Sequence, residues 1–139
     1  MATVDQRADV VRFDALTVKD GRAHAVVRRA HAERLCAGHF PGAPIVPGAY
    51  LAGLMVDVAA ALVAATARTP DTPPAVGAAG ARLLAIEDCL FVRPVVPHEP
   101  IVIAAEIVPG AAGERRVRVD VRAHDERAAR ATLRFAGPA

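Results

Sequence analysis

Aromatic residues are scarce in this sequence: among its 139 residues there is no tryptophan, one tyrosine and four phenylalanines. The hydrophobic content of 53% therefore comes mainly from alanine, valine and leucine, and a single domain over residues 1–139 can bury an adequate core. The two cysteines, Cys36 and Cys89, and the five histidines lack metal-ligand spacing. We interpret both cysteines as small core residues and expect neither a metal nor another cofactor.

An excess of one charge is also lacking, since 17 basic and 15 acidic residues leave a formal net charge of +2. That balance, without a long basic run, does not favour nucleic-acid binding. The first ten residues include acidic side chains and no apolar signal core, so we expect a cytoplasmic protein.

Residues 48–67 form a long apolar run, and about twenty such residues are enough to span a bilayer. Gly53 and Asp57 near the middle of the run, and the strand patterns on either side of it, argue against a membrane segment. A helix of a soluble protein that is apolar all round must be buried on every side. We therefore expect residues 47–67 to form one central helix enclosed by the rest of the domain.

Strands are predicted on both sides of this helix. The clearest lies at 114–123, where charged residues alternate with valines that point inward, a period of two. The nearly continuous apolar strand at 99–108 is expected to be covered on both faces. The other strands are expected at 10–18, 22–30, 81–93 and 127–136, with turns at 19–21 and 124–126 and loops at 31–46 and 68–80. This order predicts an α+β domain in which an antiparallel sheet curls around one helix.

A stiff, tightly turned loop precedes the helix. It reads Gly38-His39-Phe40-Pro41-Gly42-Ala43-Pro44-Ile45-Val46-Pro47-Gly48. Proline is tolerated in the first turn of a helix, so Pro47 and Gly48 mark where the helix begins. The free N–H groups of a helix start can bind a polarised carbonyl, and glycine lets a ligand approach them. His39 is therefore a candidate for acid–base chemistry beside such a carbonyl.

This loop resembles the signature of the FabZ/FabA family, the 3-hydroxyacyl-[acyl carrier protein] dehydratases of the hotdog fold. A second segment is similar to another motif of that family: Ile86-Glu87-Asp88-Cys89-Leu90-Phe91-Val92-Arg93-Pro94-Val95-Val96-Pro97. The resemblance implies a hotdog fold, with an antiparallel sheet wrapped around one long central helix. It also implies a side-by-side dimer with active sites at its interface. The implied reaction is dehydration of 3-hydroxyacyl thioesters, carried on the phosphopantetheine arm of acyl carrier protein, in fatty acid or polyketide biosynthesis.

The resemblance also implies the catalytic groups. His39 would remove the proton next to the thioester carbonyl, and the Gly48 N–H would bind the carbonyl oxygen as negative charge develops there. The family has a Glu or Asp fourteen positions after the histidine, but Gly53 stands there in this sequence. Asp57 lies one helical turn further on the same face and is the candidate acid. The alternative for Asp57 is a structural polar group at a dimer interface.

The missing side chain at Gly53 leaves room for an acyl chain, which we expect Phe40, Tyr50 and Leu54 to line, although Tyr50 has packing as its alternative role. Arg93 is the candidate contact for an acidic carrier protein. Two other functions stay open. One is a non-autonomous subunit that pairs with a different hotdog chain supplying the missing carboxylate, and the other is an acyl thioesterase of the same fold.

Overall fold

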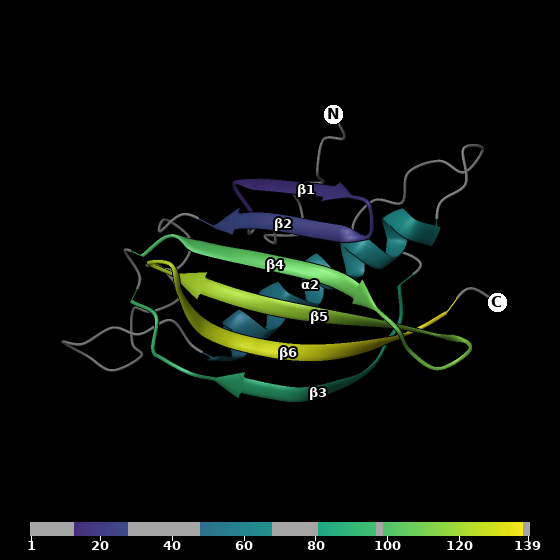
Figure 1. The fold of residues 1–139 in the computed structure, drawn as a ribbon. Coiled ribbons are helices and arrows are strands. Elements are labelled where there is room, and N and C mark those ends of the chain that lie inside the picture. The colour runs from purple at the N-terminus through teal and green to yellow at the C-terminus, as the bar shows by residue number, and fades with distance from the viewer. Residues whose placement is uncertain (1–12, 28–47, 68–80, 97–98, 138–139) are drawn as a thin grey trace.

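The computed structural model describes residues 13–27, 48–67, 81–96 and 99–137. In these ranges the elements follow one another as β1 (Ala15–Lys19), β2 (Arg22–Val27), α2 (Gly48–Ala67), β3 (Leu83–Phe91), β4 (Ile101–Val108), β5 (Glu114–Ala123) and β6 (Glu126–Ala136). The six strands form one sheet in the order β1-β2-β4-β5-β6-β3, and every neighbouring pair is antiparallel. Figure 1 shows this curved sheet with α2 lying across one face. The predicted antiparallel sheet around one long helix is confirmed.

Two tight hairpin turns set the register of the strand pairs β1–β2 and β5–β6. The β1–β2 turn passes through Asp20 and Gly21 with φ values of 52° and 74°, and the β5–β6 turn passes through His124 and Asp125 with φ values of 53° and 61°. Two successive residues at positive φ are characteristic of the type I′ turn, whose twist matches that of the flanking strands. Both turns were predicted from the sequence.

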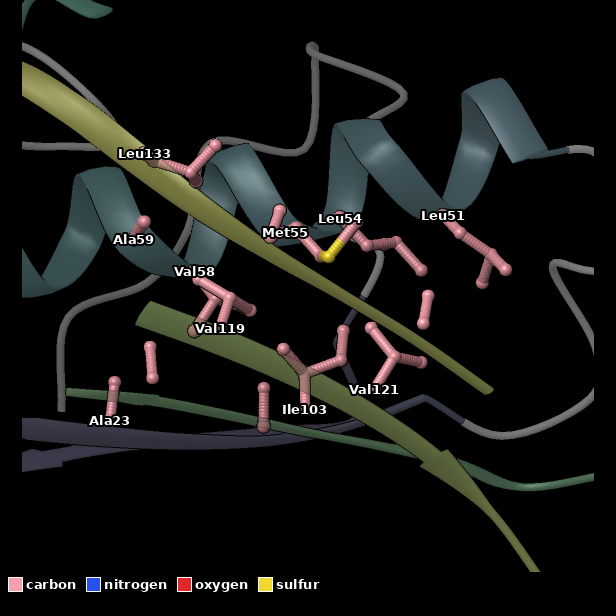
Figure 2. Close-up of a cluster of buried hydrophobic side chains, with 14 of the residues drawn as sticks. Ala23, Leu51, Leu54, Met55, Val58, Ala59, Ile103, Val119, Val121 and Leu133 are labelled. Carbon is pink, nitrogen blue, oxygen red and sulfur yellow. The ribbon is translucent and has the colours of Figure 1, made fainter. Parts of the chain in front are cut away.

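The core lies between α2 and the face of the sheet that the helix covers. Side chains of α2 project toward the sheet, and inward-facing side chains of β2, β4, β5 and β6 meet them (Figure 2). The buried set drawn there includes Ala23, Leu51, Leu54, Met55, Val58, Ala59, Ile103, Val119, Val121 and Leu133. In β5 the valines are buried and the charged residues between them are half-buried or exposed, as the alternation predicts. Small alanines among these positions let the helix approach the sheet closely.

Three expectations about burial are wrong. The outer face of β4 is not covered, since Ala104 is exposed and Val102 is half-buried. The helix is not buried on every side: Gly53 and Asp57 are half-buried, because a single sheet covers only one side of a helix. Cys89 is exposed rather than part of the core. Cys36 lies outside the described residues.

The bounds of the elements agree with the predictions at α2, β5 and β6 to within one residue, whereas β4 begins at 101 rather than 99. Strand β3 is shorter than the predicted 81–93, and β1 begins at Ala15 rather than at 10. Residues 10–12, 28–47 and 68–80, which include most of the predicted loops, lie outside the described ranges.

By length and composition α2 would be able to cross a membrane, and it is the one such helix among the residues that the structure describes. Its buried side packs against β2, β4, β5 and β6, however, and contributes much of the core. The core helix of a soluble domain has this arrangement.

Strand β3 forms one edge of the sheet, since β6 is its only neighbour among the strands that the structure describes. Apolar side chains are exposed along and just beyond it, namely Leu83, Leu84, Ile86, Leu90, Phe91 and Val92. A long apolar edge is a template for pairing with another chain. This edge is therefore the part of the described surface that most needs a partner.

Candidate functional site

The start of α2 is where the two sequence motifs meet. Gly48 is the first residue of the helix, and Phe91 ends β3. A Cβ built on Gly48 would lie 3.5 Å from Cζ of Phe91 and 3.6 Å from its two Cε atoms. These nearly equal distances show that the face of the ring, near its tip, covers the helix start. The first N–H groups of a helix have no acceptor within the helix, and the helix dipole places partial positive charge there. The site therefore combines polar N–H groups with an apolar aromatic wall.

The glycine at position 48 is not forced by packing. Separations of 3.5–3.6 Å are ordinary van der Waals contacts, so a methyl group would fit between the helix and the ring. In its absence a gap about the width of a methyl group separates Gly48 from Phe91. Glycine at this position therefore places no side chain between the ring and the backbone N–H groups of the helix start.

One side of α2 continues from this start. Tyr50, Gly53 and Asp57 follow at helical spacing, so they share this side, and all three are half-buried. A Cβ built on Gly53 would meet nothing within 4 Å, so the missing side chain does leave open space. Tyr50 packs against the core cluster, in keeping with a packing role. Leu54 is fully buried among core residues and faces the sheet (Figure 2).

Of the predicted site residues, Gly48, Tyr50, Gly53 and Asp57 are thus placed along one helix. His39 and Phe40 lie outside the described residues, so their predicted roles stay predictions. Within the described ranges, no three His, Cys, Asp or Glu side chains are grouped so that they could share a metal ion.

Arg93 is held inside the protein by several partners. Its Nη2 lies 3.1 Å from Oε2 of Glu99, its Nε lies 3.3 Å from Oε2 of Glu126, and its Nη1 donates to the carbonyl of Ala123 at 3.4 Å. Only 28% of its side chain is exposed. The carrier-protein contact predicted for Arg93 stays a prediction, but the guanidinium group already serves an internal ion pair.

Glu99 is a residue of this region that sequence reasoning missed. Burial by itself raises the pKa of its carboxyl group, but the hydrogen bond from the Val96 N–H and the nearby charge of Arg93 outweigh burial and lower that pKa below its usual value of 4.5. Glu99 is therefore ionised at neutral pH. The available signal was an acidic residue two positions after Pro97, which ends the second family-like segment.

A hollow of about 410 Å³ lies elsewhere, on the face of the sheet away from α2. Charged side chains of β2, β4 and β5 line it, among them Arg22, Glu106 and Arg118. These charges pair with one another, as in Arg22–Glu106 and Arg118–Glu106. Because this hollow contains neither a helix start nor any predicted site residue, we do not consider it the candidate active site.

Solved structures define the class of fold. The phenylacetic acid degradation protein PaaI from Thermus thermophilus, solved as a point mutant, superposes with a TM-score of 0.70 at 16% identity, over 96% of this chain and 100% of that one. A Streptococcus mutans protein bound to acetyl CoA superposes with a TM-score of 0.69 at 15% identity, over 91% of this chain and 89% of that one. Such low identities establish the hotdog fold and nothing more.

The sequence itself gives the family. The model of the ApeI-like dehydratases, described as ApeI dehydratase, matches residues 15–132, and the chain therefore belongs to that family. A 3-hydroxyacyl-[acyl-carrier-protein] dehydratase FabZ from Thermus thermophilus is 35% identical over 99 residues, which cover 70% of this chain and 65% of the relative. The FabZ of Dinoroseobacter shibae is 31% identical over 111 residues, or 79% of this chain and 60% of the relative. The chain thus spans less than two thirds of the length of these relatives.

Proposed function

We propose that this protein dehydrates 3-hydroxyacyl thioesters to trans-2-enoyl thioesters. The observation that carries the proposal is the meeting of Gly48 and Phe91, one from each family-like motif, at the start of α2. Membership of a dehydratase family and the FabZ relatives support the same reaction. We further propose acyl carrier protein as the carrier of the substrate, fatty acid or polyketide synthesis as the setting and the cytoplasm as the compartment.

The proposed reaction needs a base, an oxyanion donor and an acid. His39 accepts the proton from the carbon next to the thioester carbonyl, and the N–H of Gly48 binds the carbonyl oxygen while negative charge develops there. The carbon–oxygen bond of the 3-hydroxyl group then breaks, the acid supplies a proton to the departing oxygen, and water and the enoyl double bond result. No oxidant or reductant is required, since both carbons change only by loss of water.

Two groups are candidates for the acid that donates this proton. Asp57 lies one turn beyond Gly53 on the same side of α2 and is half-buried, so it borders the open space at Gly53. The alternative is a carboxylate contributed by a different hotdog chain across a dimer interface. We favour Asp57, because it lies on the same side of α2 as Gly53, the position at which the family carries its carboxylate.

The proposed assembly is a dimer of this chain formed along β3. The apolar side chains exposed at this edge, and the outward backbone groups that an edge strand presents, fit a second β3 lying antiparallel across a two-fold axis. A heterodimer with another hotdog chain is the alternative outcome. Because Phe91 ends β3, either dimer would enclose the site at the start of α2.

The test is replacement of the proposed base. We expect His39→Ala to reduce dehydration of a 3-hydroxyacyl thioester by about a hundredfold or more, since acid–base groups contribute that much. His24 is a matched control, because it is exposed on the outer face of β2, away from α2. His24→Ala should keep wild-type activity, and both variants should keep the wild-type melting temperature. Near-normal turnover by His39→Ala would show that the base is wrongly assigned.

The same assay separates a dehydratase from a thioesterase, the other function kept open by the fold. A dehydratase forms the conjugated enoyl thioester and releases no thiol, whereas a thioesterase releases free thiol and forms no enoyl product. Release of thiol from an acyl thioester that lacks a 3-hydroxyl group would favour the thioesterase.

A further inference from the structure

Glu99 is the sole buried charged residue in the part of the chain that the structure describes. Its side chain is 2% exposed, whereas its partners Arg93 and His124 are 28% and 63% exposed. Oε1 accepts the N–H of Val96 at 2.8 Å, and Oε2 lies 3.1 Å from both Nη2 of Arg93 and Nε2 of His124. A buried carboxylate with this many donors is held firmly in one orientation.

Through Arg93, Glu99 ties two distant parts of the chain together. The guanidinium group binds Glu99 on one side and, on the other, the β5–β6 turn, through the carbonyl of Ala123 and the carboxylate of Glu126. The partner in the turn is solvated, since Glu126 is 70% exposed. An exposed ion pair contributes little, so the buried Glu99 is the main anchor of Arg93.

The backbone beside Arg93 is fixed at the same place. The N–H groups of Val92 and Arg93 both donate to the carbonyl of Ala128 in β6, at 2.7 and 3.3 Å. Phe91 directly precedes these two residues, and its ring is the wall that faces Gly48. Phe91 is 47% exposed and ends an edge strand, so its own packing constrains the ring weakly. The backbone of Phe91 pairs with Ala129 of β6, and the two residues that follow extend this attachment.

We propose that Glu99 is a positioning residue, whose buried carboxylate anchors Arg93 and thereby holds the ring of Phe91 against the start of α2. The proposal rests on the proposed function, in which the N–H of Gly48 binds the thioester carbonyl beside the ring of Phe91. With the ring in place, the thioester carbonyl is kept in line with the N–H of Gly48. When the anchor is loosened, the ring moves and the carbonyl is less well oriented.

The first experiment reads the position of the ring without any assay of activity. Because the chain contains no tryptophan, Phe91→Trp introduces a single fluorescent probe at this wall. In that background Glu99→Gln should shift the emission to longer wavelength and increase quenching by iodide. Glu126→Gln is the matched control, since it removes the exposed partner of the same arginine, and it should change neither quantity.

An unchanged emission in Glu99→Gln, or an equal change in Glu126→Gln, would overturn the proposal. Should the tryptophan variant fail to fold, hydrogen exchange of the Val92 and Arg93 amides in otherwise wild-type protein decides the question. Exchange there should accelerate in Glu99→Gln, with little change in the core strand β5. Uniform acceleration across the sheet would mean that Glu99 has only a general stabilising role, which contradicts the proposal.

The second experiment is a kinetic double-mutant cycle on the dehydration reaction. Misplacement of a reacting group by about 1 Å can cost up to about a hundredfold, so we expect Glu99→Gln to lower kcat by about tenfold or more, with a small change in KM. Phe91→Ala should have a similar effect, and the double variant should be no slower than the slower single variant. Effects that multiply in the double variant would show that Glu99 does not act through Phe91.

The structural and the kinetic experiments together distinguish a failure of the proposed function from a failure of the role proposed for Glu99. A wild-type protein that lacks dehydration activity would refute the proposed function, while the fluorescence and exchange results would still decide whether Glu99 positions the ring. Normal activity in Glu99→Gln with a displaced ring would instead leave the dehydratase in place and refute the role of Glu99 in it.

Discussion

Replacing Gly53 by alanine should make the protein more stable and, at the same time, a poorer catalyst for long acyl chains. Glycine within a helix costs about 1 kcal/mol relative to alanine, because it loses more backbone freedom on folding. At Gly53 nothing offsets this cost, since φ is not positive and a Cβ would meet nothing within 4 Å. We therefore expect Gly53→Ala to raise the free energy of unfolding by about 1 kcal/mol.

For a domain of 139 residues, that gain corresponds to a rise in melting temperature of about 3–5 °C. Thermal unfolding followed by circular dichroism measures it. Ala64→Gly calibrates the scale, because Ala64 is half-buried on the same side of α2 and its replacement should lower stability by a similar amount. The presence of glycine at position 53, despite its cost in helix stability, is explained if the acyl chain occupies the space beside it.

Activity provides the second half of the prediction. Gly53→Leu should fill the space beside the helix, so turnover of long-chain 3-hydroxyacyl thioesters should fall much more than turnover of a short-chain substrate. Gly53→Ala should show the same bias more weakly. A Gly53→Ala protein that is less stable than wild type would mean that this space is already filled. Equal losses for all chain lengths would show that the acyl chain does not pass Gly53.

Three further predictions concern the acid, the buried carboxylate and the edge strand. If Asp57 is the acid, Asp57→Asn should abolish turnover but keep substrate binding, whereas restoration of activity by a second hotdog protein, even with Asn at 57, would assign the acid to the partner. Because the pKa of the Glu99 carboxyl group is lowered in the folded state, its contribution to stability should be complete above 4.5 and should disappear as the pH falls through the lower folded value. Glu99→Gln should therefore destabilise the protein by about 3 kcal/mol at neutral pH and by less in acid, and a difference independent of pH in urea unfolding would contradict this. Finally, Ile86→Lys should shift the protein from dimer to monomer in analytical ultracentrifugation, and a dimer that survives this change would place the interface away from β3.

Local patterns in the sequence were sufficient to predict most of the fold. The alternation at 114–123 identified β5 because the sheet leaves one face of that strand to solvent, and the apolar run identified α2 to within one residue. The exposure of Ala104 and of one side of α2 was not predictable in this way. Hydropathy records that a segment is apolar, and it does not record whether one chain alone covers it.

The candidate site was predicted in part. Gly48, Gly53 and Asp57 were recognised because they lie in or near a motif on one helix, where spacing determines which side each residue occupies. The contacts of Glu99 were not predicted from the sequence. Its partners Arg93 and His124 come from separate segments of the chain, and the order of the strands brings these two segments together. Pairing of β3 with β6 brings the β5–β6 turn to the end of β3, and no local pattern encodes that approach.

The place of β3 in the sheet has a consequence for how the protein folds. Although β3 precedes β4 and β5 in the chain, the described strand that it pairs with is β6, and Leu83 must pair with Phe135. Such distant pairing forms slowly, because the closure of a long loop must come before any contact compensates for it. During synthesis the apolar β3 therefore emerges well before its neighbour exists. The newly made chain must pass through an interval in which this strand is open to aggregation or to chaperones, and the wall beside Gly48 is among the last features to form.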